Sequence, residues 1–509
     1  MFGPLLGSLG EIVQTQYLLP LAIGTLAGML GGALPGVTIT MTIIIVLPFT
    51  FGLDPLAGLA AMVGVYVGGE SGGLVTASLL GIPGTPSAVA TTFDGFPMAR
   101  HGQPGRAVWL GTWASFFAGI LGAIFLVAAT VPLARFALQF GPWEYFSLFI
   151  FALSMVAGLT EHSLLKGFLS GAIGLLITVI GTDPIMAVPR FHFGTDFLRN
   201  GFQFLPVLIG IFAFAQIMTD LERMGAGQRA ARIEAPSLAV SHPAVIWDIV
   251  KRPFLMLWST LIGLLIGVLP AVGGSAANVM AYDQAKKFSR HPEKFGTGIP
   301  EGIIASEAAN NANVAGSLVT IMAFGIPGDA VTAVMLGAMI IHGIQPGPLF
   351  MTQEPRVAYG IFAAYIMAHP VMMLLQWLLA RVYLRVVQVP TSILIPNILV
   401  LCVIGAYALN NVMDNVHALL LFGVLGYLLV KFGFPLAPLI LGVILGDQIE
   451  VNLVRSLMTD ADPWQFVTRP ISGAMLALSV LSVVLALWQH RRQYRRAAAP
   501  AAGGPDTDF

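Results

Sequence analysis

The residues whose types and spacing best suit a binding site follow two copies of the sequence GIPG. The first copy, residues 81–84, precedes Thr85 and Ser87, and the second copy is residues 325–328. Gly and Pro interrupt a helix, and the helix that begins after the interruption presents unpaired N–H groups and a partial positive charge. Such an end, with two hydroxyl groups beside it, suits a carboxylate or a phosphate. Hydroxyl groups at helix starts are also ordinary caps, so a purely structural role for both residues stays open.

A second polar stretch, EGIIASEAANNAN at residues 301–313, shortly precedes the second GIPG. Glu307, Asn310 and Asn311 have the i, i+3, i+4 spacing that places side chains on one helix face. Ionisable groups within an apolar segment are functional candidates, and this face suits a hydroxy acid, a proton or a sodium ion. A structural polar network between packed helices is the alternative. Asp329 would repel an anion, so we expect it to cap a helix or help to hold a cation.

These patterns predict a substrate site and a group that couples transport to an ion. Backbone N–H groups beside Gly84 and Gly328 are expected to contact the substrate, and both glycines are expected to need a positive φ angle. The predicted substrate-binding residues are Gly36, Gly84, Thr85, Ser87, Asn310, Asn311 and Gly328. The predicted ion-coupling residues are Glu307 and Asp329. We expect no cofactor other than a bound sodium ion.

Composition indicates the class of protein that holds these residues. Of the 509 residues, 56% are hydrophobic and only 10% are charged; soluble domains carry roughly 25% charged residues. Apolar runs near the ~20 residues that cross a bilayer recur along the chain, for example at residues 107–133 and 357–380. We therefore predict an all-α polytopic membrane protein with about 11–12 membrane segments.

An internal repeat is visible in the order of three elements. TLAGMLGGALPGV from Thr25 matches TLIGLLIGVLPAV from Thr260, the two GIPG sequences match, and HGQPG from His101 resembles HGIQPG from His342. Three matching elements in one order indicate a duplication. The elements also suggest that each half contains Gly/Pro-broken helices or re-entrant hairpins.

The distribution of basic residues predicts that the two halves have opposite orientations. Residues 1–99 contain no Lys or Arg, whereas residues 223–252 contain five and residues 286–294 contain four. Basic residues collect in short cytoplasmic loops. We therefore predict an inverted repeat with a periplasmic N-terminus and a cytoplasmic C-terminus, the arrangement typical of secondary transporters with a site near the membrane midplane.

The predicted organisation has four parts. Residues 1–220 form the first transmembrane repeat, 221–252 a cytoplasmic linker, 253–490 the second transmembrane repeat with a final helix, and 491–509 a disordered cytoplasmic tail.

Enzyme function is the least supported class. GESGG at residues 69–73 fits the G-x-S-x-G pattern of hydrolases around Ser71, but the strand-to-helix turn that this nucleophile requires is not predicted. The sequence has no P-loop and no HExxH, and its one cysteine, Cys402, cannot build a thiolate metal site. We expect neither catalysis nor a metal centre.

Two long stretches resemble a known family. GIPGTPSAVATTFDGFPMARHGQPGRAV at residues 81–108, and the stretch from Gly267 to Pro348 around the second GIPG, are similar to signatures of the large membrane subunit of the tripartite tricarboxylate transporters, the TctA family. The similarity covers roughly residues 17–470.

The resemblance implies an importer of small organic anions, such as tricarboxylates or other carboxylates. It implies a permease in the bacterial inner membrane, driven by a sodium or proton gradient. The implied partners are a small membrane subunit with about four spans, a periplasmic solute-binding protein and membrane lipid, and no nucleic acid is implied. A passive channel, or a transporter of a neutral or cationic solute, is the alternative, and an intramembrane hydrolase is a more remote one.

The inverted repeat can be tested by labelling single cysteines in a Cys402→Ser background. A cysteine placed near Asp54 should react with a membrane-impermeant reagent from the periplasm, and one near Arg290 only from the cytoplasm, because the basic loops lie inside. Labelling of both positions from the same side would instead indicate a parallel duplication.

Overall fold

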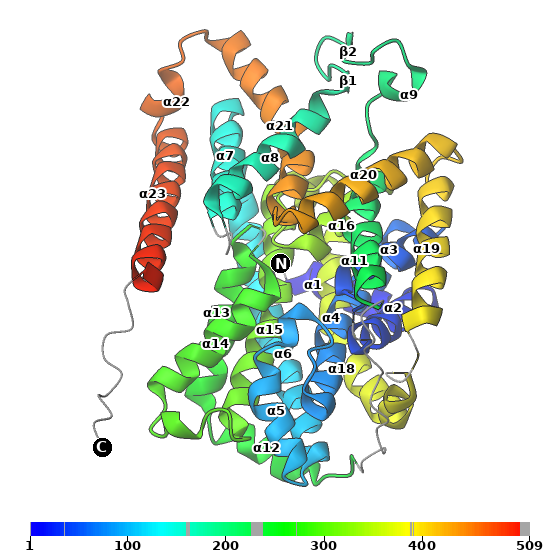
Figure 1. Cartoon of the computed structure of the whole chain (residues 1–509), viewed down its shortest axis with the longest axis vertical. Coiled ribbons are helices and arrows are strands. Elements are labelled where there is room, and N and C mark those ends of the chain that lie inside the picture. The colour runs from blue at the N-terminus through cyan, green and yellow to red at the C-terminus, as the bar shows by residue number, and fades with distance from the viewer. Residues whose placement is uncertain are drawn as a thin grey trace, which may run out of the picture. The chain divides into compact units, whose positions relative to one another are not determined.

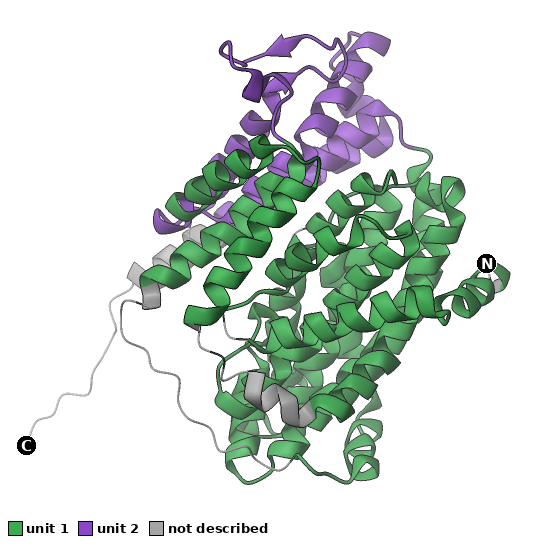
Figure 2. Ribbon diagram, turned by 90° about the vertical axis from the view of Figure 1, so that its right-hand side faces the viewer, with its two compact units in different colours: residues 1–139, 203–428 green, residues 140–202, 429–509 purple. Residues whose placement is uncertain are grey.

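Helices make up nearly all of the secondary structure. The computed structural model describes residues 2–34, 36–158, 163–224, 238–270, 272–386, 389 and 391–498. Within these residues the strands are β1 (Gly181–Thr182) and β2 (Pro189–Arg190), which pair antiparallel. The chain forms two compact units (Figure 2): unit 1 contains residues 1–139 and 203–428, and unit 2 contains residues 140–202 and 429–509.

Unit 1 holds both GIPG sequences and most of the described helices. Figure 1 labels many of these helices. Its α-helices are α1 (Phe2–Ile12), α2 (Thr15–Ala33), α3 (Ile39–Val46), α4 (Pro55–Leu80), α5 (Thr91–Arg100), α6 (Pro104–Ala137), α10 (Phe204–Leu208), α11 (Ala215–Met224), α12 (His242–Val250), α13 (Pro253–Val268), α14 (Gly273–Phe288), α15 (Pro300–Phe324), α16 (Ala330–Ile341), α17 (Phe350–Gln353), α18 (Pro355–Val386), α19 (Thr391–Ala408) and α20 (Met413–Lys431), which runs past the unit boundary. Its 3₁₀ helices are η1 (Leu47–Thr50), η2 (Pro86–Ala88) and η4 (Pro292–Lys294), and a π-helix, η3 (Ile209–Phe214), joins α10 to α11.

Unit 2 consists of fewer helices and the β1–β2 hairpin. Its helices are α7 (Pro142–Gly158), α8 (Leu164–Val179), α9 (Asp196–Arg199), α21 (Leu436–Thr459), α22 (Gln465–Thr468) and α23 (Pro470–Ala498). Arg190 ties the hairpin to α21 through two hydrogen bonds of 2.5 Å to Glu450, and it also pairs with Asp183 at 3.2 Å. Backbone N–H groups of Met186 and Ile185 lower the pKa of Asp183, because they stabilise its ionised form.

The predicted all-α polytopic membrane class is confirmed. Among the described residues, eight helices are long and apolar enough to cross a membrane, or up to nine if α12 and α13, bent by 79°, form one span. The further apolar helices of 10–17 residues are Ile39–Thr50, Leu164–Val179, Ala330–Ile341 and Ser392–Ala408. The expected count of about 11–12 segments depends on how these shorter helices are counted. Helix α15 is not one of the eight, yet every residue from Gly302 to Ala323 is buried, so it runs through the interior of unit 1.

One part of the predicted organisation differs from the structure. Helix α23 continues to Ala498, so residues 491–498 are helical and do not belong to a disordered tail. Residues 499–509, and residues 225–237 of the predicted linker, lie outside the described part of the chain. The two compact units each combine segments from both halves of the sequence, so the repeat boundaries stay a prediction.

Helices α2 and α4 approach backbone to backbone through two glycine stripes. Gly24, Gly28 and Gly32 on α2 recur every four residues, and Gly64, Gly68 and Gly72 do so on α4. A Cβ atom on Gly28 would stand 2.1 Å from the carbonyl oxygen of Val65. A Cβ on Gly68 would stand 2.2 Å from the carbonyl oxygen of Thr25. Small residues at this spacing are the usual means of close helix packing in membranes.

The pair α13 and α15 repeats this contact in the second half. A Cβ on Gly263 would lie 2.2 Å from the carbonyl oxygen of Ala309, and one on Gly316 would lie 2.4 Å from that of Leu264. The helices α2 and α13 also end alike, since their C-caps Leu34 and Leu269 are both extended. These shared features support the predicted duplication, while the opposite orientation of the halves stays a prediction.

A buried aspartate fixes the loop that leads into α15. One carboxylate oxygen of Asp94, on α5, accepts hydrogen bonds from the backbone N–H groups of Gly296, Gly298 and Ile299 at 2.9, 2.8 and 3.1 Å. Its other oxygen accepts a bond of 2.9 Å from the hydroxyl group of Tyr282. Asp94 is fully buried, whereas Gly296 is exposed and Gly298 and Ile299 are partly buried. The carboxylate therefore sets where α15 begins.

Replacing Asp94 by alanine should lower the stability of the protein. The change removes the acceptor of three backbone N–H groups and of the Tyr282 hydroxyl group, and each bond to a charged group contributes about 1.5–3 kcal/mol. We expect a clear fall in the melting temperature of the detergent-purified protein, measured by scanning fluorimetry. Asp283→Ala is the control, because Asp283 is half exposed and pairs with Lys287 four residues away. Equal melting temperatures for the two variants would refute the assigned role.

Candidate functional site

Both GIPG sequences end a helix, as predicted. Helix α4 ends at Leu80 and α15 ends at Phe324, and the following residues, Gly81 and Gly325, are left-handed with φ angles of 68° and 71°. A left-handed residue after a helix is usually glycine, because a Cβ atom would clash there. The expectation that Gly84 and Gly328 have a positive φ is wrong, since the left-handed residue is the first glycine of each GIPG.

Gly84 and Gly328 are needed for a different reason, which is close packing. A Cβ on Gly84 would lie 2.2 Å from the carbonyl oxygen of Gly32, at the end of α2. In the same way, a Cβ on Gly328 would lie 2.5 Å from the carbonyl oxygen of Gly267 and 2.7 Å from Cα of Ser317. Protein therefore fills the side-chain space of both glycines, and only their backbone groups are left for a ligand.

We call the interruptions at residues 81–84 and 325–328 the first and the second break. The first break lies against a carboxyl group of α4. Thr85 and Ser87 are buried, and their hydroxyl oxygens are 3.0 Å apart. Ser87 donates a hydrogen bond to Glu70, and Asn310 of α15 donates through Nδ2 to the backbone oxygen of Glu70 at 3.2 Å. Thr85 makes no side-chain cap bond to η2. The structure thus brings together three predicted residues, Thr85, Ser87 and Asn310, around a carboxyl group that was not predicted.

The second break is built around Asp329. Oδ1 of Asp329 accepts from the backbone N–H of Thr332 at 2.8 Å, and the Thr332 hydroxyl accepts in return, which makes a capping box for α16. Oδ2 accepts a hydrogen bond from the hydroxyl group of Tyr66. It also accepts from Oγ of Ser317 at 3.4 Å and from Nδ2 of Asn313 at 3.5 Å. The expectation that Asp329 caps a helix is confirmed, and its role in ion coupling stays a prediction.

Glu307 and Asn311 lie in a third group of buried polar side chains. Glu307 accepts from the hydroxyl groups of Thr91 at 2.5 Å and Ser115 at 3.2 Å. Asn311 donates to Ser115 at 2.7 Å and accepts from Ser71 at 3.2 Å. Ser71 thus lies inside helix α4 and not at a strand-to-helix turn, so it lacks the setting of a hydrolase nucleophile.

The three groups meet along the facing helices α4 and α15. We call them together the polar centre: Tyr66, Glu70, Ser71, Thr85, Ser87, Thr91, Ser115, Glu307, Asn310, Asn311, Asn313, Ser317 and Asp329. Gly36 is the predicted site residue that does not join it. Gly36 is exposed between α2 and α3, with a φ angle of +90°, and the side chain nearest to its Cβ position is that of Asp220 at 3.5 Å.

Sequence reasoning missed Tyr66, Glu70, Asn278 and Asn313. Asn278, on α14, accepts from the backbone N–H of Ala90 at 2.7 Å and so holds the end of the first break. The sequence could have indicated Glu70 as a functional candidate, because it is a carboxyl group within a long apolar segment. The sequence does not distinguish Tyr66, Asn278 and Asn313 from other polar residues, because their role depends on which helices are in contact.

The polar centre is acidic. Among the described residues, no lysine or arginine forms an ion pair with Glu70, Glu307 or Asp329. In that same part of the chain, no group of three or more His, Cys, Asp or Glu side chains could hold a metal ion. Oxygen atoms from carboxyl, amide and hydroxyl groups are what this centre offers to a ligand. These atoms suit a proton or a hard cation, and the hydroxyl and N–H groups suit a polar anion.

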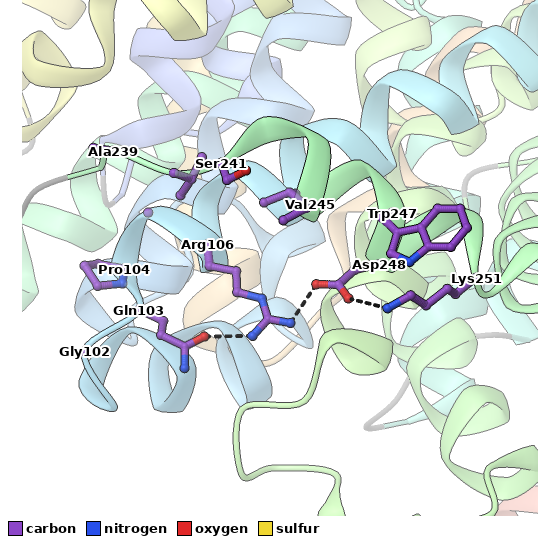
Figure 3. Close-up of a pocket in the computed structure, with 13 residues that line it drawn as sticks. Gly102, Gln103, Pro104, Arg106, Ala239, Ser241, Val245, Trp247, Asp248 and Lys251 are labelled. Carbon is purple, nitrogen blue, oxygen red and sulfur yellow. Dashed lines mark hydrogen bonds and ion pairs between the residues drawn. The ribbon is translucent and has the colours of Figure 1, made fainter.

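A separate cavity of about 530 Å³ lies at the start of α6 and beside α12 (Figure 3). Asp248 accepts from Arg106 at 2.6 Å and lies 3.9 Å from Lys251, while Gln103 accepts from Arg106 at 2.8 Å. One carboxylate therefore faces the two basic side chains of this cavity. None of the predicted site residues lines it.

The fold and the polar centre define a class. Broken helices that end beside buried polar side chains, in a chain with many membrane-spanning helices, are typical of membrane transport proteins. The model of the tripartite tricarboxylate transporter TctA family matches residues 18–441. The chain belongs to this family, whose name describes a transporter.

Two proteins of Agrobacterium vitis are similar to the chain. An uncharacterized 52.8 kDa protein in the TAR-I ttuC' 3' region is 35% identical over 478 residues, which is 93% of each chain. An uncharacterized protein in the TAR-II ttuC' 3' region is 36% identical over 234 residues, which is 46% of this chain and 97% of that protein. No solved structure matches the chain.

The packing at the breaks predicts that even alanine is too large at Gly84 and Gly328. Each Cβ would overlap a backbone oxygen, and overpacking of this kind costs about 1–3 kcal/mol. We expect Gly84→Ala and Gly328→Ala to lower the melting temperature and the yield of monodisperse protein in size-exclusion chromatography. Gly52→Ala is the matched control, because nothing lies within 4 Å of its Cβ position. Wild-type behaviour of the two break variants would show that the contacts are not needed.

Proposed function

We propose that this protein is the permease subunit of a secondary active importer of small organic anions. The substrates in this proposal are tricarboxylates or other carboxylates, and a sodium or proton gradient drives their uptake. The observation that carries the proposal is that both helix breaks lie against one buried polar centre. Non-helical backbone at membrane depth is tolerated where it is enclosed by protein or lines a cavity, and transporters bind their substrates there.

The start of α14 supports a binding role for carboxylates. Helix α14 begins at Gly273, and no side chain caps its first turn. The Cβ position of Gly273 is 3.4 Å from Cβ of Asp329, and that of Gly274 is 2.9 Å from Oδ1 of Asn310. The partial positive charge of this helix end is therefore next to both breaks. Free N–H groups and nearby hydroxyls are the anion-binding groups in this proposal.

The acidic character of the centre supports coupling to a cation. A carboxylate substrate beside Glu70, Glu307 and Asp329 would be repelled unless positive charge entered with it. No basic residue in the described chain pairs with these groups, so the proposal assigns the compensating positive charge to co-transported ions. Glu307 and Asp329 remain the proposed coupling residues from the sequence.

The proposed partners and location follow from the family. Its name describes a three-component system, which supports a small membrane subunit of about four spans and a periplasmic solute-binding protein as partners. We propose the bacterial inner membrane as the location, with the N-terminus in the periplasm and the C-terminus in the cytoplasm. A bound sodium ion is the one further ligand in the proposal.

The alternative is a passive channel, or a transporter of a neutral or cationic solute. The excess of buried carboxyl groups favours this alternative, because such a centre attracts cations directly. An intramembrane hydrolase is the least supported option, since Ser71 donates to Asn311 and no histidine among the described residues forms a hydrogen bond with it.

Uptake by the complete system in proteoliposomes tests the proposal. The reconstituted complex should accumulate radiolabelled citrate or another tricarboxylate above the external concentration, and the accumulation should collapse when an ionophore removes the driving gradient. A matched preparation without the solute-binding protein is the control and should not accumulate label. Equilibration without accumulation would favour a channel, and accumulation of a labelled cation alone would favour the cationic alternative.

A further inference from the structure

The three carboxyl groups of the polar centre have different hydrogen-bond environments. Both oxygens of Glu307 accept from hydroxyl groups, those of Thr91 and Ser115. Both oxygens of Asp329 likewise face donors: Thr332 on one side, and Tyr66 on the other. An ionised carboxylate can only accept hydrogen bonds, so these two environments suit the ionised form.

Glu70 has a different environment. Its Oε2 accepts from Ser87, whereas its Oε1 lies on the side of Gly274, where Oδ1 of Asn310 also lies. Measured from the position that a Cβ on Gly274 would take, Asn310 Oδ1 is 2.9 Å away and Glu70 Oε1 is 3.2 Å away. Asn310 Oδ1 is buried and has no hydrogen-bond partner. Two acceptor oxygens therefore lie near one point beside Gly274, and the one on Asn310 lacks a donor.

The orientation of the Asn310 amide is determined by its other end. Its Nδ2 donates to the backbone oxygen of Glu70 at 3.2 Å. Turning the amide over would place Oδ1 against that carbonyl oxygen and would break the bond. Asn310 therefore has to present its oxygen toward Gly274 and the Glu70 carboxyl group.

The charges around Glu70 also oppose its ionisation. Asp329 and Glu307 are the carboxyl groups close enough to interact with it electrostatically, and Tyr66 lies one turn away on α4. The neighbouring helices α2 and α3 carry no acid or base other than Tyr17 at the start of α2. On α14 the ionisable residues are Tyr282, Asp283, Lys286 and Lys287, all in its second half and away from Gly274. On α5, Asp94 is already bound to the loop before α15, and Arg100 lies at the far end of the helix.

We propose that Glu70 is held as a neutral carboxylic acid whose O–H group donates to Oδ1 of Asn310, and that this proton is the one carried with the substrate. The inference rests on the proposed function for its transport role, whereas the protonated state rests on the hydrogen-bond pattern alone. One proton completes the arrangement, because it supplies the donor that Asn310 Oδ1 lacks.

Release of the proton would alter the contact between α4 and α15. The O–H bond of Glu70 breaks, the proton passes to water, and the electron pair stays on the carboxylate. The carboxylate and Asn310 Oδ1 then face each other as two acceptors, which is unfavourable in a buried site. Loss of the proton therefore weakens the contact between the two broken helices and couples proton release to their separation.

Infrared spectroscopy of the purified protein tests the protonated state directly. A protonated carboxyl group has a C=O stretch that is distinct from the bands of a carboxylate. The spectrum of wild type minus Glu70→Gln at neutral pH should contain this band, and Glu307→Gln should leave it in place. Absence of the band from the spectrum of wild type minus Glu70→Gln would overturn the proposal. Absence of the band from the spectrum of the Glu307→Gln protein would also overturn it. If Glu70→Gln fails to fold, Asn310→Leu takes its place, and the band should then move to higher frequency because its acceptor has been removed.

Transport of radiolabelled citrate by the reconstituted complex tests the coupling role. Glu70→Gln keeps a donor toward Asn310 but cannot release a proton, so citrate exchange should persist while accumulation driven by a pH gradient falls at least tenfold. Glu354→Gln, an exposed site, is the control and should behave as wild type. Unchanged gradient-driven accumulation in Glu70→Gln would overturn the coupling role. If wild type does not transport citrate, the proposed substrate fails, and the infrared result still decides the state of Glu70.

Discussion

Two helices, α4 and α15, end at the GIPG sequences beside the buried polar centre, and the backbone groups released at those ends need partners. In apolar surroundings an unpaired N–H or C=O group costs several kcal/mol. The protein meets this constraint with local bonds: Gly325 donates to the carbonyl oxygen of Ile321 at 3.0 Å, and Asp329 then caps α16. The polar side chains around the breaks are placed by the same requirement.

The glycine residues of α4 determine which of its faces packs against α2 and which face carries the polar side chains. Gly64, Gly68 and Gly72 form the face that touches α2. With about 100° of rotation per residue, Tyr66 and Glu70 point away from that face, and they meet residues of α15. Backbone contact on one side therefore leaves the other side free to build the polar centre, and α13 with α15 uses the same principle.

The two breaks share a backbone but differ in chemistry. With the shift of 244 residues that aligns Gly81 with Gly325, Thr85 corresponds to Asp329 and Gly73 corresponds to Ser317. The first break thus presents hydroxyl groups to Glu70, whereas the second presents a carboxylate to Tyr66 and Ser317. The duplicated scaffold therefore provides two similar positions with different ligands, which allows anion binding and cation coupling to be divided between the halves.

The sequence by itself determined the membrane class, the positions of both breaks and the likeness of the two halves. It could do so because hydropathy and Gly/Pro interruption act locally, on one helix at a time. It also indicated five residues of the polar centre that lie next to the breaks or on one face of α15: Thr85, Ser87, Glu307, Asn310 and Asn311. The capping role of Asp329 was readable from its position after the break.

Only the tertiary structure decided which polar groups meet. Glu70 and Asn310 are 240 residues apart, and Tyr66 and Asp329 are 263 residues apart, so no local pattern connects them. The exclusion of Gly36 from the centre, and the packing role of Gly84 and Gly328, likewise depend on the helix that lies opposite each glycine. Whether a buried carboxyl group faces donors or an acceptor is a property of its neighbours in space, and that property distinguishes Glu70 from Glu307.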